Sequence, residues 1–302
     1  MGRANLFILN DTRVLPDRDF REIAKRVRAI ASDIRVAVVT EKRGRRLAQW
    51  TQLLRPTLFV ELQEVPGLQR WRGVVARQRT RSKMAAYRML EAAGLPVPPW
   101  REIVPGTALD PAEWGPWVVL KPDLGHRGLN VEAAATEAVR YRAPEEFPPG
   151  HLGREAPLLA QRLIDTERGP AYYRVTTCFG TPLFALHYFT ERSPPATEGQ
   201  PPVIQVDSAS GRALCDDADL LDLARRVHAL LPDVPTIGCD ILRERGTGRL
   251  WLAEINQSQV WALSSPVGIK TQAKRGLDFY AQFGALDRAA EAMVRATRRM
   301  AR

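Results

Sequence analysis

The chain has 302 residues, of which 45% are hydrophobic and 26% are charged, as in ordinary soluble globular proteins. Its 44 Lys and Arg residues outnumber 34 Asp and Glu residues, and the net charge of +10 favours an anionic partner such as a nucleotide, an acidic peptide or a nucleic acid. Three widely spaced cysteines indicate neither a disulfide framework nor a zinc site, and no apolar run has the length of a membrane span. We therefore expect a cytoplasmic protein with no membrane partner, and we regard nucleic acid as an unlikely partner.

The first 80 residues are expected to form a small α/β domain. Short apolar runs predict strands at residues 5–9, 35–40 and 57–61. Apolar residues at helical spacing predict helices over residues 20–30 and 45–54. Strands that alternate with helices in this way predict a small parallel sheet. No GxGxxG follows the first strand, so the pattern does not indicate a dinucleotide site.

A basic segment from Arg77 to Lys83 precedes the next predicted helix, Lys83–Ala93. Ser82 is a good N-cap because its hydroxyl can accept a backbone N–H, and Gly94 is suited to end the helix. Lys83 therefore lies in the first turn, where it can reach a phosphate group. The basic cluster is also consistent with a solvated linker.

A glycine loop follows the buried strand that is predicted at residues 117–120. The strand leads to Lys121, and Gly125 and Gly128 come next. Glycines three residues apart allow a loop to fold closely over an anion, with backbone N–H groups available to phosphate oxygens. His126 is kept as a candidate phosphate-loop residue. Most loops of this kind are plain turns, so the pattern alone leaves both interpretations open.

The second half of the chain is predicted to contain two hairpins and two helices. The first hairpin turns at Gly180, and its first strand, residues 171–178, carries Arg174. Helices are expected at residues 217–231 and 286–302. The last helix is basic, but we expect it to pack on the protein and not on a membrane because it lacks bulky aromatic residues.

The second hairpin carries the acidic residues that matter most. Its strands, residues 238–243 and 250–256, flank the turn sequence Gly-Thr-Gly centred on Thr247. Folding about Thr247 places Asp240 opposite Glu254, and Asn256 shares the face of Glu254 because side chains alternate along a strand. Two carboxylates and a carboxamide oxygen are hard ligands that suit Mg2+ bound to phosphates. The alternative is a solvated polar face.

Five segments in this order resemble the ATP-grasp superfamily, and most closely its RimK-like carboxylate–amine ligases. The segments are SKMAAYRMLEAAGLPVP, WVVLKPDLGHRGLNV, LLAQRLID, YYRVTTCFGTPLFALHY, and GCDIL with LWLAEIN. They are similar, in turn, to the helix that opens the central domain, the strand with its lysine and lid loop, the segment that joins the two halves holding ATP, the next hairpin, and the metal hairpin. The resemblance covers roughly residues 80–265.

The resemblance implies an α/β (α+β) ATP-grasp fold in three parts. A small N-terminal α/β domain covers residues 1–80, a central lid subdomain covers 81–163, and a C-terminal subdomain with the metal hairpin covers 164–302. The implied cofactors are ATP and Mg2+, with Mn2+ as an alternative metal.

The resemblance also implies roles for individual residues. Lys121 and Arg174 are the implied catalytic residues, with Arg174 near the transferred phosphoryl or acyl group. The implied ATP contacts are Lys83, Lys121, Gly125, His126, Arg127, Gly128, Gln161, Arg162, Leu163, Ile164 and Asp165. The implied metal ligands are Asp240, Glu254 and Asn256. Where the family commonly places an acidic residue for ribose, this chain has Tyr172, and Asp165 or Glu167 is the candidate substitute.

The implied reaction is the ATP-dependent formation of an amide or peptide bond through an acyl phosphate. The partners would be ATP, a carboxylate substrate, and an amine substrate that is a small molecule, a peptide or a protein. Two other hypotheses remain open. One is a kinase-like phosphoryl transferase of the same fold, and the other is a non-catalytic module that binds nucleotide or nucleic acid. Assembly into a homo-oligomer is also left open.

Overall fold

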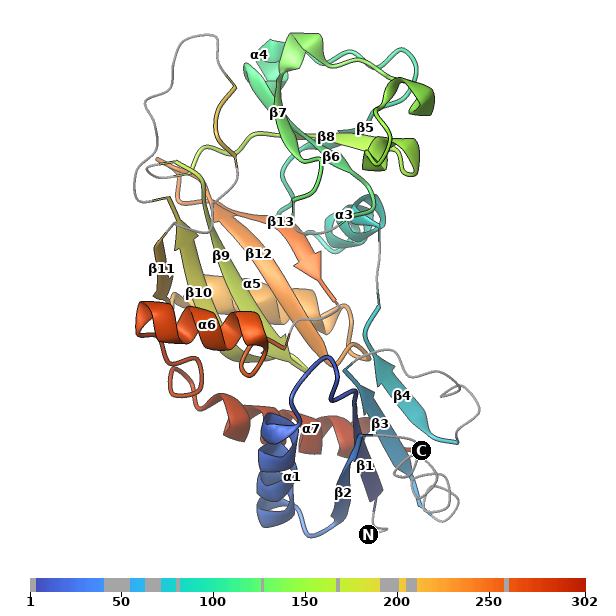
Figure 1. Cartoon of the computed structure of the whole chain (residues 1–302), viewed down its shortest axis with the longest axis vertical. Coiled ribbons are helices and arrows are strands. Elements are labelled where there is room, and N and C mark those ends of the chain that lie inside the picture. Colours follow the sequence, from blue (N-terminus) through green and yellow to red (C-terminus); the bar gives the residue numbers. More distant parts are fainter. Residues whose placement is uncertain are drawn as a thin grey trace.

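Three β-sheets follow one another along the long axis of the molecule (Figure 1). The computed structural model describes residues 4–40, 55–62, 72–79, 82–125, 128–166, 169–190, 201–204, 211–257 and 261–302. Within this part of the chain, no helix is both long and apolar enough to cross a membrane.

The first sheet is parallel and has the strand order β2-β1-β3-β4. Its strands are β1 (Ala4–Asn10), β2 (Ile34–Thr40), β3 (Thr57–Glu61) and β4 (Val74–Arg77). Helix α1 (Arg18–Ile30) packs on it through Phe20, Ile23, Ala24 and Val27. The predicted parallel sheet is confirmed, and β4 is an additional strand. The helix that we predicted over residues 45–54 lies outside the described residues.

The second sheet is small and antiparallel, with the order β5-β8-β6-β7. Its strands are β5 (Trp100–Glu102), β6 (Trp117–Pro122), β7 (Glu132–Ala135) and β8 (Leu158–Arg162). The short helix α4 (Pro111–Trp114) contributes Trp114 to a core of its own with Ile103, Leu109 and Val118. Helix α3 (Lys83–Ala92) lies between this sheet and the next one (Figure 1).

The third sheet has five antiparallel strands in the order β11-β10-β9-β12-β13. They are β9 (Ala171–Cys178), β10 (Thr181–Phe189), β11 (Gly211–Leu214), β12 (Thr236–Arg243) and β13 (Leu250–Asn256). Helix α5 (Ala218–Ala229) covers one face, whereas α6 (Pro266–Arg275) and α7 (Ala285–Met300) lie on the other (Figure 1).

Alternation along the strands assigns each side chain of the third sheet to one of these faces. Val175 and Cys239 belong to the core beneath α5. Their neighbours Arg174 and Asp240 therefore point to the opposite face, which is directed away from α5. This face carries the candidate functional residues.

Helix α7 joins the third sheet to the first. Met293 and other residues of α7 share one buried cluster with Phe20 of α1 and Phe184 of β10. Two ion pairs connect α7 with the N-terminal unit: Arg298 binds Asp33 at 2.8 Å and Arg26 binds Asp287 at 2.7 Å. The predicted C-terminal helix that packs on the protein is thus confirmed.

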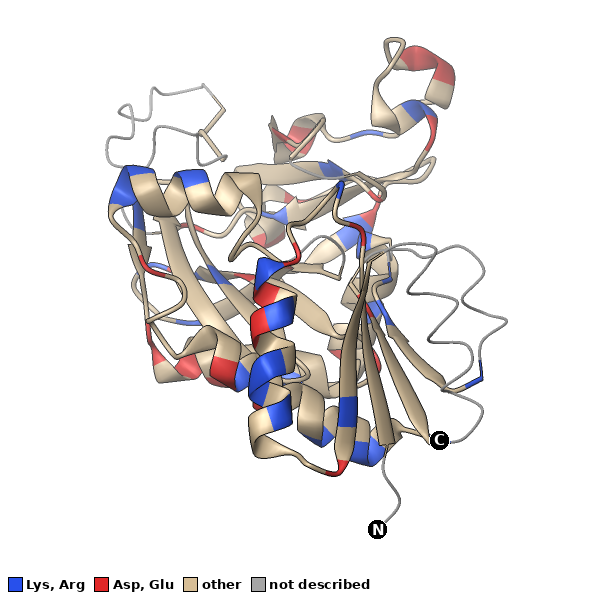
Figure 2. Ribbon diagram, turned by 60° about the horizontal axis from the view of Figure 1, so that its bottom comes forward, with Lys and Arg blue, Asp and Glu red and all other residues tan. Residues whose placement is uncertain are grey.

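The surface charge differs between helices (Figure 2). Acidic and basic residues are interleaved along α1, whereas the ionisable residues of α6 are all basic. The basic excess of the chain is therefore distributed over several elements.

Candidate functional site

The hairpin of β12 and β13 brings the two predicted carboxylates together. Asp240 pairs with Glu254 and Gly238 pairs with Asn256, so the predicted facing of the acids is confirmed. The register shifts between Asp240 and Ile241, because Ile241 pairs with Leu252 and leaves one bulged residue on β13.

Arg174 on the neighbouring strand β9 binds Asp240 through both of its oxygens. Its Nε donates to Oδ1 and its Nη2 donates to Oδ2, each at 2.6 Å. Asn256 Nδ2 donates to the same Oδ2 at 3.2 Å. Burial disfavours the charged guanidinium, but the contact with Asp240 outweighs it and raises the pKa of Arg174. Arg174 and Asp240 therefore form a fixed, charged pair at the centre of the sheet face.

Glu254 faces this pair, and its pKa is subject to opposing effects. Burial raises the pKa of Glu254, and the neighbouring Asp240 raises it further, while Lys83, Lys121 and Arg174 act in the opposite direction. Two facing carboxylates and an amide form a donor set that a divalent cation fits, since a cation would relieve this repulsion. The described residues contain no cluster of three or more His, Cys, Asp or Glu side chains that could bind a metal. Among the described residues, a cation at this place would be held by these two acids and Asn256.

The two predicted lysines approach the acids from the second sheet and from α3. Lys121 is the penultimate residue of β6, where burial lowers its pKa to about 8 and the nearby Lys83 adds to this effect. Lys83 begins α3 behind its N-cap Ser82, as predicted. Asp123 fixes the two segments together, because it accepts from Met84 N at 2.8 Å. Glu254 acts on Lys121 in the opposite direction and raises its pKa, so the lysine and the acid lie within reach of each other's charge.

The glycine loop closes near the start of α3. Lys83 Nζ donates to the carbonyl of Gly125 at 3.3 Å. Gly125 has φ +133°, and a Cβ there would lie 2.6 Å from Cδ1 of Leu152, so this position requires glycine. Gly128 also has positive φ. His126 and Arg127, which were predicted to contact ATP, lie outside the described residues.

The predicted linker residues divide into two groups. Gln161 is buried on β8 and accepts a hydrogen bond from Lys121 Nζ, so it lies within the site. The side chains of Arg162 and Asp165 instead bind the β12–β13 turn, since Arg162 pairs with Glu244 at 3.3 Å and Asp165 pairs with Arg245 at 2.6 Å. Leu163 and the buried Ile164 lie between Arg162 and Asp165 in the chain.

Four residues around the site were not predicted from the sequence to be part of it: Tyr172, Tyr188, Arg212 and Tyr87. The rings of Tyr172 and Tyr188 stack with centroids 4.6 Å apart, and the guanidinium carbons of Arg174 and Arg212 lie 6.0 and 5.0 Å from the Tyr188 ring centre. Burial raises the pKa of Tyr172 and of Tyr188, so both remain neutral hydroxyls. Tyr87 lies on α3. The one signal for it in the sequence is its position on the apolar face of a predicted helix. A buried tyrosine needs a partner for its hydroxyl, so this position indicates a polar contact.

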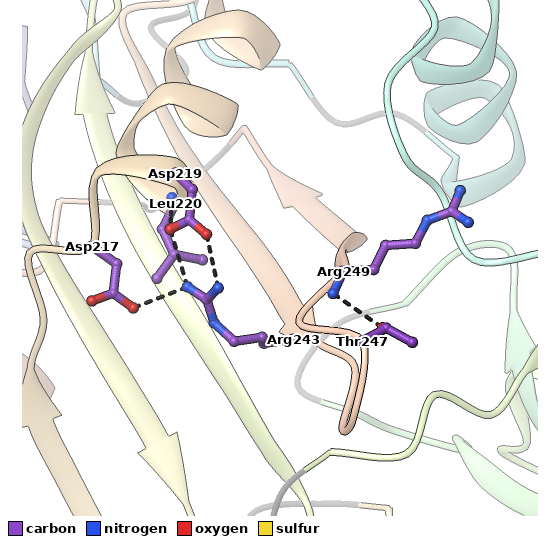
Figure 3. A network of polar contacts seen from close by, with 6 residues as sticks. All are labelled: Asp217, Asp219, Leu220, Arg243, Thr247 and Arg249. Carbon is purple, nitrogen blue, oxygen red and sulfur yellow. Dashed lines mark hydrogen bonds and ion pairs between the residues drawn. The ribbon is translucent and has the colours of Figure 1, made fainter.

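The opposite face of the hairpin is fixed to α5 by a separate network (Figure 3). Arg243 of β12 donates to Asp219 at 2.8 and 3.0 Å and to Asp217 at 3.0 Å. The hairpin is therefore held on both faces, by α5 on one side and by Arg174 on the other.

No protein-family model matches this chain, and no curated protein matches its sequence. Solved structures do match its fold. The D-cycloserine synthetase DcsG is 15% identical with a TM-score of 0.52, and the alignment covers 97% of this chain and 99% of that one. The ATP-grasp ligase PsnB, complexed with a phosphomimetic variant of a minimal precursor, Mg and ADP, has the same identity and TM-score over 98% of this chain and 100% of its own. PsnB with the precursor peptide PsnA2 and AMPPNP matches at 15% identity and a TM-score of 0.51, over 97% and 98% of the two chains. The chain therefore has the ATP-grasp fold, as predicted.

Proposed function

We propose that this protein is an ATP- and Mg2+-dependent ligase that joins a carboxylate to an amine. One observation carries the proposal: Lys83, Lys121 and Arg174 all act electrostatically on the half-buried Glu254, which faces Asp240 across the hairpin. Three cations and two carboxylates from three parts of the chain thus meet on one face of an ATP-grasp fold. Such a site neutralises and aligns phosphoryl groups, which is what this chemistry requires.

The reaction needs no covalent nucleophile from the protein. A substrate carboxylate oxygen attacks the γ-phosphorus, ADP leaves, and the amine then attacks the acyl carbon and expels phosphate as it loses a proton. Lys83 and Lys121 would bind phosphate oxygens, and Arg174 would bind the group being transferred. Asp240, Glu254 and Asn256 would hold Mg2+, which supplies further charge neutralisation.

The nature of the amine substrate is a finer part of this proposal. One structural neighbour is described with a bound precursor peptide, and another is a synthetase of a small molecule. The net charge of +10 suits an acidic peptide or protein as substrate. We further propose that the protein acts in the cytoplasm, with residues 1–80, 81–163 and 164–302 as its three functional parts.

The test is a screen of carboxylic acids crossed with amines, in which ADP release is measured and products are identified by mass. We expect ADP release that depends on both an acid and an amine. A phosphorylated product that forms without any amine would instead support a kinase-like transferase. Binding of nucleotide without turnover, weakened steeply by salt, would support a non-catalytic module.

Two variants test the metal ligands. Asp240→Asn or Glu254→Gln should abolish ATP turnover and leave the fold intact, because each removes one carboxylate charge with little change in shape. Asp219→Asn is the matched control, since Asp219 also pairs with an arginine but lies on the α5 side of the sheet. Full turnover in both site variants would refute the assigned metal ligands.

A further inference from the structure

Three side chains from three elements form a continuous chain of hydrogen bonds that ends at the acidic hairpin. Lys121 Nζ on β6 donates to Gln161 Oε1 on β8. Gln161 Nε2 donates to the hydroxyl of Tyr87 on α3 at 3.1 Å. The Tyr87 hydroxyl donates to the carbonyl of Ala253 on β13. Ala253 is the bulged residue of the hairpin and directly precedes Glu254.

The chemistry of the two ends fixes the direction of every bond in this chain. A backbone carbonyl only accepts, so the single hydroxyl proton of Tyr87 is committed to Ala253. The Tyr87 oxygen must therefore accept from the amide N–H of Gln161, and this turns the carbonyl oxygen of Gln161 toward Lys121. An ammonium group only donates, so Lys121 matches that oxygen.

Burial prevents water from replacing these contacts. Tyr87 is 1% exposed and Gln161 is 2% exposed. Loss of the hydroxyl would remove the acceptor of the Gln161 N–H and the side-chain donor to the Ala253 carbonyl, and the amide of Gln161 would be free to rotate away from Lys121.

We propose that Tyr87 is a positioning residue that couples Lys121 to the hairpin of Asp240 and Glu254. Its hydroxyl sets the orientation of Gln161, which holds the ammonium of Lys121, and it also fixes the bulge that sets the direction of Glu254. The lysine and the acid are thereby held at a constant separation although they belong to different sheets. The inference rests on the proposed function only in taking Lys121 as a nucleotide contact.

The test is a double-mutant cycle on nucleotide affinity. The dissociation constant of Mg·ADP is measured by calorimetry for the full chain and its Tyr87→Phe, Lys121→Met and doubly substituted variants. We expect Tyr87→Phe alone to weaken ADP binding about tenfold, the scale of one buried hydrogen bond. In the Lys121→Met background the same change should weaken binding much less, because only the part of its effect that passes through the hairpin bulge remains.

Two further variants provide the controls. Tyr280→Phe removes another tyrosine hydroxyl, which donates to Asp19 at 2.9 Å far from the hairpin, and it should leave ADP affinity unchanged. Gln161→Met breaks the chain at its middle and should reproduce the part of the Tyr87→Phe effect that passes through Lys121, so it serves if the latter variant is poorly folded. Unchanged affinity in Tyr87→Phe, or an equal loss on top of Lys121→Met, would overturn the proposal.

The outcome can be separated from that of the proposed function. ADP binding requires neither an acid nor an amine, so the cycle is measured without turnover. Failure of every acid and amine pair to release ADP would refute ligation and leave the coupling intact. Additive effects in the cycle would refute the coupling and leave ligation intact.

Discussion

Lys121 is a lysine whose charge is already weakened by its surroundings. Burial lowers its pKa to about 8, and Lys83 adds to the shift. Below this pH the ammonium is present and can bind phosphate, and above it the neutral amine predominates. We therefore predict that ADP affinity falls as the pH rises above about 8, by up to about tenfold per pH unit. Calorimetric titrations between neutral and alkaline pH would measure this.

A guanidinium provides the control for this prediction. In Lys121→Arg the charge persists throughout the range, so the alkaline loss of ADP affinity should largely disappear even if the affinity itself is lower. An alkaline loss of the same size in the arginine variant would assign the titration to another group.

His228 is a buried histidine that the proposed chemistry does not use. Its Nε2 donates to the carbonyl of Val234 at 2.9 Å, and its Nδ1 lies 2.7 Å from the hydroxyl of Thr177. Burial lowers its pKa to about 4, against 6.5 for an ordinary histidine. The native state therefore holds the neutral ring, whereas the unfolded chain takes up a proton below pH 6.5.

The stability that depends on neutral His228 is complete above about pH 6.5 and decreases as the pH falls toward 4. Between pH 7 and pH 5 we predict a loss of about 2 kcal/mol from this residue. Urea unfolding of the protein and of His228→Gln at both pH values isolates it, because all other titrating groups are common to the two. An equal pH dependence in the two proteins would contradict the prediction.

At the scale of elements, the hairpin of β12 and β13 shows which strand pairings could be predicted from the sequence and which could not. Folding about Thr247 correctly predicted that Asp240 faces Glu254. The same symmetry would pair Leu242 with Leu252, but the structure pairs Leu242 with Trp251. Between the turn and the bulge the pairing is therefore shifted by one residue, and the predicted register holds only from Asp240 and Glu254 onward. No glycine marks the bulge, so local sequence patterns did not reveal it.

Other elements were missed for definable reasons. Strands β4, β7 and β11 have four residues each, too few for an alternating pattern to stand out. Helix α6 buries only Gly268 and Thr271, so it has no apolar stripe. The helical position of Tyr87 was predicted, but its partners Gln161 and Ala253 are distant in sequence and could not be.

Gly268 provides a prediction for α6. Replacing glycine by alanine inside a helix normally stabilises it by about 1 kcal/mol. Here a Cβ would lie 1.6 Å from the carbonyl oxygen of Ala262, which is backbone. We predict that Gly268→Ala destabilises the protein by about 2 kcal/mol or more, because α6 must move. Urea unfolding would measure this, with Lys274→Ala on the exposed face of α6 as the control; a stabilised Gly268→Ala would contradict it.

At the scale of the whole molecule, the order of the segments could be predicted from the sequence. The packing of the last helix against the first sheet could not. The five motifs gave the correct fold because each has a distinctive local pattern. The apolar face of residues 286–302 predicted a packed helix, but such a face does not identify its partner. In the structure it packs against two sheets at once.

This shared core should make the first and third sheets unfold together. Met293 is fully buried in it, and Met293→Ala would leave a cavity that costs about 2–5 kcal/mol. We predict that hydrogen exchange accelerates in both β1 and β10, but not in β6 of the second sheet, which has its own core. Met89→Ala in α3, outside the shared core, is the control. Faster exchange in β10 alone would show that the two sheets are independent.

The position of α7 also has a consequence for synthesis on the ribosome. The backbone N–H of Thr57 in β3 donates to the carbonyl of Arg302 at 3.0 Å, so a strand of the first sheet is completed by a residue that is synthesised only after α7. Domains commonly fold one after another as they emerge. The second sheet can do so here, whereas the first must wait, partly exposed, until translation has passed α7. In the nascent chain the second sheet would thus fold before the first sheet.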